Sequence, residues 1–172
     1  GQLTRASEFI DNFIKYSNKN DHLIVIINQH ANLDIELINS IKLIKIYFPL
    51  GIFNWIIRML WENTFQLLLL RSLNPDIYLT FSHYLPLKKL SIPTVVAVSN
   101  LAPFSNRAIN KEQIFGKCRL KLLYYSIIYT AKIATSIIAL SEECKTVLIK
   151  NGIDRSKIRI IPNGVSIQSL NC

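Results

Sequence analysis

The chain has 172 residues, of which 50% are hydrophobic and 18% are charged, and its net charge is +9. This length and apolar content suffice for one domain with a sizeable core, and the absence of low-complexity runs excludes a disordered chain. Residues 1–20 carry charges among their apolar positions, unlike a signal peptide. The longest uncharged stretch, residues 90–106, contains two prolines, which excludes the apolar helix of about 20 residues that spans a bilayer.

The three cysteines, Cys118, Cys144 and Cys172, have no metal-like spacing such as C-x-x-C. An odd number of scattered cysteines is typical of free thiols in a reducing compartment. Three buried cysteines that behave as small apolar residues would give the same pattern. We therefore expect a cytoplasmic protein with free thiols.

The apolar pattern alternates along the chain between helical spacing and short β-branched runs. Helical spacing predicts helices over residues 3–16, 53–74, 116–134 and 141–151. Apolar runs rich in β-branched residues predict strands over residues 22–27, 41–48, 77–81, 94–98, 136–140 and 157–161. Pro75 ends the second helix because the residue before a proline disfavours helical geometry. Gly152 closes the last helix because glycine readily adopts left-handed geometry.

The second predicted helix carries an apolar stripe opposite a polar face. The stripe consists of Phe53, Ile56, Ile57, Leu60, Leu67 and Leu68, and the polar face consists of Arg58, Glu62, Asn63 and Gln66. This division is typical of a helix that packs its apolar stripe on a core.

Strands that alternate with helices predict a doubly wound, parallel α/β sheet. Ligands of such sheets bind beyond the carboxyl ends of the strands. The residues that directly follow the strands are therefore the candidates for a site, at positions 28–30, 82–84, 99–100, 141–142 and 163–164. Ser141 is suited to cap the helix that follows it, and Glu142 and Glu143 suit the positive end of that helix.

A basic segment between residues 107 and 132 accounts for much of the positive charge. It carries Arg107, Lys111, Lys117, Arg119, Lys121 and Lys132 against one acid, Glu112, and Leu, Ile and Tyr residues lie between them. Basic amphipathic segments favour anionic membrane surfaces, for which Lys117, Arg119, Lys121 and Lys132 are the candidates. An ordinary solvated face with a compositional bias would look the same. Nucleic-acid binding is not expected, because no reader motif accompanies the charge.

The carboxyl-terminal third carries the most specific pattern. The stretch SIIALSEECKTVLIKNGIDRSKIRIIPNGVSI resembles the end of the amino-terminal domain in the large retaining glycosyltransferase family typified by sucrose synthase and bacterial mannosyltransferases. The matching residues are Ser141, Glu142, Gly152, Pro162, Asn163, Gly164 and Val165. Upstream, IPTVVAVSNLAPF resembles a strand and loop where that family often carries His-Asp or His-Asn, and NPDIYLTFSHY resembles the preceding strand.

The resemblance implies the Rossmann-like, amino-terminal half of a GT-B fold, with helices on both faces of a parallel sheet. It implies transfer of a sugar from a nucleotide-sugar donor to a glycan or glycolipid acceptor, with retention of configuration at the anomeric carbon. It also implies that the reaction needs no metal and no other cofactor. On this interpretation residues 1–172 form one acceptor-side domain truncated at both ends. Its first strand and the carboxyl-terminal donor-binding domain are missing, and the chain alone has no transferase activity.

The resemblance also names the residues expected near acceptor or donor, although it assigns no catalytic residue. They are Gly1, Gln2, His83, Ser99, Asn100, Ser141, Glu142, Asn163 and Gly164. Gly1 and Gln2 resemble the end of the glycine-rich loop of the family, and Ser99 stands where the family often has His. A non-catalytic Rossmann-like binding or regulatory module, with His83 as a structural hydrogen-bonding residue, remains the alternative.

Overall fold

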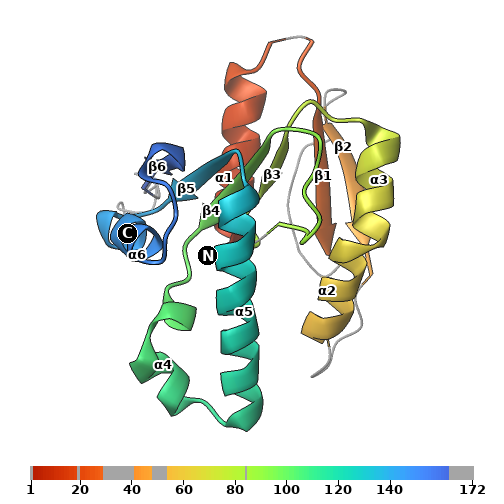
Figure 1. The fold of residues 1–172 in the computed structure, drawn as a ribbon. Helices are drawn as coiled ribbons and strands as arrows, with labels where there is room; N and C mark the ends of the chain where they lie inside the picture. The colour runs from red at the N-terminus through yellow and green to blue at the C-terminus, as the bar shows by residue number, and fades with distance from the viewer. Residues whose placement is uncertain (1, 19, 29–40, 48–53, 84, 163–172) are drawn as a thin grey trace, which may run out of the picture. The chain divides into compact units, whose positions relative to one another are not determined.

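A computed structural model describes residues 2–18, 20–28, 41–47, 54–83 and 85–162 of the chain (Figure 1). The chain divides into two compact units, residues 1–64 and residues 65–172. Parallel strands and helices build both units, which confirms the predicted α/β, Rossmann-like fold. The prediction that the whole chain is a single domain lacking its first strand stays a prediction.

The first unit contains two helices and a two-stranded parallel sheet. Its elements are α1 (Gln2–Tyr16), β1 (Leu23–Asn28), β2 (Ile41–Ile46) and α2 (Asn54–Asn63). The register places Leu23 opposite Ile41 and Asn28 opposite Ile46. After α1 the chain turns where the Asn18 N–H donates to the Asp21 carboxylate at 2.8 Å, in the polar cluster that the sequence marks as a helix end.

The second unit contains a four-stranded parallel sheet of order β3-β4-β5-β6. The strands are β3 (Tyr78–Thr80), β4 (Thr94–Val98), β5 (Ser136–Ala139) and β6 (Ile158–Ile160). The helices are α3 (Phe65–Leu73), α4 (Asn106–Lys111), α5 (Ile114–Ile133) and α6 (Glu142–Lys150), with short 3-10 helices η1 (Ala102–Phe104) and η2 (Arg155–Lys157). The predicted strands therefore all form, each within two residues of its predicted limits.

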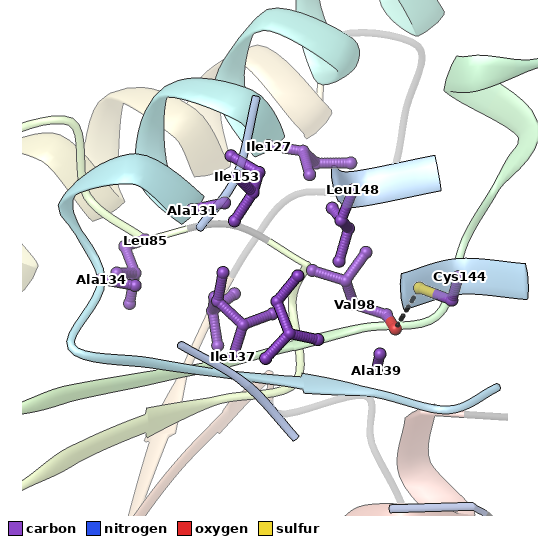
Figure 2. Close-up of a cluster of buried hydrophobic side chains, with 12 residues drawn as sticks. Leu85, Val98, Ile127, Ala131, Ala134, Ile137, Ala139, Cys144, Leu148 and Ile153 are labelled. Atoms are coloured by element: carbon purple, nitrogen blue, oxygen red, sulfur yellow. Dashed lines mark hydrogen bonds between the residues drawn. The ribbon is translucent and has the colours of Figure 1, made fainter. Parts of the chain in front are cut away.

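The core of the second unit lies where α5 and α6 meet one face of this sheet (Figure 2). Alternate strand residues supply the sheet side: Val96, Val98, Ile137 and Ala139 are fully buried, because successive side chains of a strand point to opposite faces. The helices contribute Ile127, Ala131, Ala134, Cys144 and Leu148 to the same cluster. Dispersion and the hydrophobic effect therefore fix both helices against the central strands.

Helix α6 ends in a Schellman motif, as the predicted glycine closure requires. The Gly152 N–H donates to the Ile149 carbonyl at 2.9 Å, and the Ile153 N–H donates to the Leu148 carbonyl at 3.2 Å. Gly152 has a φ of 79°, which glycine adopts without the steric cost of a Cβ. Ile153 and Leu148 both belong to the buried cluster, so the motif also directs the chain back onto the sheet.

The helix predicted over residues 53–74 is interrupted at Thr64 and forms α2 and α3 instead. Side chains compete with the helical hydrogen bonds there: Thr64 Oγ1 donates to the Leu60 carbonyl at 2.7 Å, and Asn63 Nδ2 donates to the Met59 carbonyl at 2.7 Å. Pro75 acts as predicted, since α3 ends at Leu73.

The expected burial of that stretch is also wrong at several positions. Leu60 and Leu68 of the apolar stripe are exposed, whereas Glu62 and Gln66 of the polar face are buried. Each of the two has one partner that offsets part of its desolvation: Arg58 Nε donates to Glu62 Oε1 at 2.8 Å, and Gln66 Nε2 lies 2.6 Å from the Tyr78 hydroxyl. Gln66 Oε1 is buried and has no hydrogen-bond partner among the described residues.

The basic segment forms two helices. Arg107 and Lys111 lie on α4, and the other four cations lie on α5. Ser105 caps α4, its hydroxyl accepting from the Ala108 N–H at 3.3 Å. In the described ranges, no helix combines the length and apolar character that crossing a membrane requires.

We predict that Leu148→Ala lowers the free energy of unfolding by about 2–5 kcal/mol, because it leaves a cavity in a fully buried position. Leu68→Ala is the matched control: its side chain is exposed, and a change within about 0.5 kcal/mol is expected. Urea unfolding measures both. Equal effects of the two substitutions would contradict the assignment of the core.

Candidate functional site

The carboxyl ends of β3, β4, β5 and β6 lie along one edge of the second sheet, because all four strands are parallel. We call this the carboxyl edge and define it by the residues that directly follow these strands: 81–83, 99–100, 140–142 and 161–162. The ladder continues past the last strand, since the Ile161 N–H donates to the Ala139 carbonyl at 2.9 Å. The loops after β5 and β6 therefore leave the sheet side by side.

His83 and Ser99, predicted separately from two strand ends, contact each other at this edge. The Ser99 N–H donates to His83 Nδ1 at 3.3 Å, and the Ser99 hydroxyl lies 3.3 Å from the same nitrogen. A backbone N–H needs an acceptor, so Nδ1 carries no proton and the neutral ring has its proton on Nε2. An imidazole therefore lies beside the position where the sequence has Ser99 in place of the family's usual His.

His83 holds an unfavourable backbone conformation. Its φ is 72°, and only Asn74 among the other described non-glycine residues also has a positive φ. The left-handed region costs an L-residue roughly 1–2 kcal/mol. His83 is also buried, so the surrounding loop fixes its ring rather than leaving it in solvent. Strain of this kind clusters at functional positions.

Asn100 presents its amide at the same edge. Its Oδ1 accepts from the Ala102 N–H at 3.0 Å, an Asx turn that starts η1. Because a backbone N–H must meet an acceptor, this contact also fixes which amide atom is oxygen. Among the described residues Nδ2 makes no hydrogen bond, so the half-buried side chain offers two donor hydrogens to a ligand.

Ser141 and Glu142 lie where β5 leads into α6. Ser141 has extended dihedral angles and its hydroxyl accepts from the Cys144 N–H at 3.1 Å, which confirms the predicted cap. Glu142 and Glu143 occupy the first turn and are exposed. Their negative charges complement the positive helix end and leave it less suited to an anionic ligand.

Cys144 ties this helix to the end of β4. Its Sγ donates to the Val98 carbonyl at 3.3 Å (Figure 2), one residue before Ser99. Burial raises the pKa of the Cys144 thiol, with the nearby Glu143 charge acting in the same direction. The thiol therefore stays protonated at neutral pH and serves as a donor rather than as a nucleophile.

The other predicted residues lie outside the described residues or on other elements. Gly1, Asn163 and Gly164 lie outside the described residues. Gln2 begins α1 in the first unit, and its side chain is outside the description as well. Lys117, Arg119, Lys121 and Lys132 all lie on α5, away from the strand ends in the sequence.

The geometry supplies donors and acceptors rather than a reactive group. Asn100 offers an amide donor and Glu142 an exposed carboxylate that accepts, beside the buried imidazole of His83, a combination suited to a ligand rich in hydroxyl groups. Within the described ranges no three His, Cys, Asp or Glu side chains are grouped so as to hold a metal ion. The expectation of metal-independent chemistry stays a prediction.

The contact between His83 and Ser99 could not be read from the sequence, because 16 residues and a strand separate the two. The sequence indicates the Asx turn of Asn100 only weakly, because Asn100 lies shortly before a proline. The Cys144–Val98 contact had none beyond the rule that cysteine is often buried.

The second unit is thus an α/β domain that gathers polar, hydrogen-bonding side chains at the carboxyl edge of a parallel sheet. A family model for Glycosyltransferase Family 4 matches residues 6–169. The match covers nearly the whole chain, and the chain belongs to this glycosyltransferase family. No curated protein matches the sequence.

We predict that Cys144 resists alkylation by iodoacetamide at pH 7, because its thiol is buried and its pKa is raised. Cys118 is exposed and serves as the internal control. Mass spectrometry of the native chain should show Cys118 modified well before Cys144, and both modified after unfolding. Rapid labelling of Cys144 in the native chain would contradict the buried hydrogen bond to Val98.

Proposed function

We propose that this chain supplies the acceptor-side half of a retaining glycosyltransferase that uses a nucleotide-sugar donor. The family match over residues 6–169 is the observation that carries the proposal. The polar carboxyl edge of the second unit supports it, because ligands of doubly wound sheets bind at that edge. A second α/β domain of the same protein would bind most of the donor.

In this proposal the described residues orient an acceptor and the donor half supplies the leaving-group contacts. Asn100 donates to an acceptor hydroxyl, the Glu142 carboxylate accepts from another, and the imidazole of His83 lies beside them at the same edge. The bond between the anomeric carbon and the diphosphate breaks, a bond to the acceptor oxygen forms, and the acceptor proton leaves with the diphosphate. Basic groups and helix amino termini of the other half, without a metal, stabilise the departing diphosphate.

Reading the coding DNA on both sides of this segment tests the two-domain proposal. An in-frame α/β domain with an E-x7-E element after Cys172 supports it and justifies assays with UDP- and GDP-sugars. A stop codon there overturns it and leaves the non-catalytic binding module as the function of the same edge.

We predict that His83→Gln lowers kcat/KM for the acceptor about fivefold in the protein encoded by the whole reading frame. The substitution removes the imidazole from this edge, and the loss of one hydrogen-bonding group is worth about 1 kcal/mol. The matched control is His22→Gln, at an exposed position before β1, which should leave kcat/KM unchanged. Equal kcat/KM values for the His83 variant and the unsubstituted enzyme would exclude a role in acceptor binding.

We also propose that the exposed face of α5 docks on an anionic membrane, which would give access to a lipid-linked acceptor or a growing surface polysaccharide at the cytoplasmic face. Ile114, Phe115, Leu122, Tyr125 and Tyr129 are 42–85% exposed. At 100° per residue Ile114, Leu122, Tyr125 and Tyr129 fall within one stripe, opposite the buried Leu120, Ile127 and Ala131.

Cations flank this apolar stripe. Arg119, Lys121 and Lys132 are exposed and Lys117 is half-buried, and among the described residues none of them forms an ion pair. Aromatic and aliphatic side chains insert into the headgroup region, while lysine and arginine stay at the charged surface. The arrangement therefore fits an anionic interface better than a plain solvated face.

We predict that the triple variant K117Q/R119Q/K121Q binds phosphatidylglycerol vesicles about 100-fold more weakly than the unsubstituted chain. Each surface cation contributes about 1 kcal/mol at an anionic membrane. The control K150Q/R155Q/R159Q removes the same charge from exposed positions on another part of the unit and should bind almost normally. Co-sedimentation measures both, and equal binding to neutral phosphatidylcholine vesicles would sink the proposal.

A further inference from the structure

A cavity lies at the amino-terminal edge of the four-stranded sheet, opposite the carboxyl edge. It has a volume of about 260 Å³ and is lined by the end of α3 and by residues 88–92. These two segments come shortly before β3 and β4, and the Tyr78 N–H donates to the Pro93 carbonyl at 3.0 Å where they meet. The cavity is therefore separate from the carboxyl edge and from its proposed sugar chemistry.

Three cations line this cavity and no acid does. Arg71 comes from α3, whereas Lys88 and Lys89 come from the segment before β4. Within the part of the chain that the structure describes, none of the three has an ion-pair partner within 4.0 Å. Like charges repel at close range, so segments remote in sequence bring together positive charge that nothing in the described fold neutralises.

The negative end of α3 does not account for this charge. A helix carboxyl terminus carries roughly half a negative charge, and Arg71 in the last turn of α3 suffices to complement it. Two further cations from a different segment exceed that need. The local excess is therefore positive and suits an anionic ligand.

The rest of the lining is largely apolar. Leu70 is buried and Leu90 and Ile92 are half-buried, so part of any ligand here leaves water. Pockets for drug-sized ligands span about 300–1,000 Å³, and this cavity is smaller. A nucleotide sugar is too large for it, whereas a phosphate group with a short apolar segment fits its size and its two chemistries.

We propose that this cavity binds a phosphate monoester of an apolar alcohol. Arg71, Lys88 and Lys89 hold the phosphate, and the carbon chain lies along Leu70, Leu90 and Ile92. The ester comes either free in solution or from a membrane, with the phosphate end in the same place in both cases. The site anchors or regulates the protein from the edge opposite the acceptor.

Isothermal titration of the 172-residue chain with hexyl phosphate, inorganic phosphate and hexanol tests the proposal. Hexyl phosphate should bind more tightly than either of the other two, because only it satisfies both chemistries. The variant R71Q/K88Q/K89Q should weaken its binding at least about tenfold, because it removes the modest contributions of three exposed charges together. Comparing the binding of hexyl phosphate in solution with the binding of phosphatidylcholine vesicles that contain hexadecyl phosphate distinguishes a free ester from one in a membrane.

The control K150Q/R155Q/R159Q carries the same change of net charge and should bind hexyl phosphate normally. Lys88→Glu, a single reversal at an exposed position, gives a second variant if the triple variant unfolds. Inorganic phosphate binding as tightly as hexyl phosphate would overturn the proposal, as would equal weakening by the control.

Discussion

The burial of the central strands β4 and β5 beneath α5 and α6 is the constraint on which the rest of the second unit depends. Val96, Val98, Ile137 and Ala139 are almost completely removed from water, and their backbone groups are satisfied by the parallel ladder between the two strands. The helices that cover them bury Ile127 and Leu148 in the same cluster. Register, helix position and the direction of each loop at the carboxyl edge follow from this one packing arrangement.

The site inherits its rigidity from the same core. Val98 is the last residue of β4 and accepts from the Cys144 thiol, so α6 begins at a fixed height above the sheet. Ser99 is the next residue, and its backbone N–H fixes the ring of His83. A strained histidine is maintained here because the buried strand end, rather than solvent, holds its partner. The packing of the core and the position of the His83 ring are therefore coupled through two adjacent residues, Val98 at the end of β4 and Ser99 directly after it.

Local rules sufficed where a single segment decides its own structure. Ser141 caps α6 and Gly152 closes it, and both functions depend on hydrogen bonds within a few residues. Contacts between segments, such as that of Gln66 with Tyr78, could not be predicted from local rules. The burial of Glu62 was also missed, although its partner Arg58 lies one turn away on the same helix. The break at Thr64 was missed because helical periodicity runs through it, while hydroxyl and amide groups compete locally for backbone carbonyls. The site followed the same division: strand ends were predictable, and the His83–Ser99 contact was not.

The distribution of charge separates the faces of the second unit. The described residues that directly follow its strands include no lysine or arginine, and two acids occupy the first turn of α6. Four cations lie on α5 and three line the amino-terminal cavity, and others lie on α4, α6 and η2. A donor diphosphate at the carboxyl edge would thus find helix-end acids rather than compensating charge from these residues, and fields from exposed cations decay over about 10 Å in salt. This distribution is consistent with the proposal, which the family resemblance implies, that a second domain supplies most of the donor contacts.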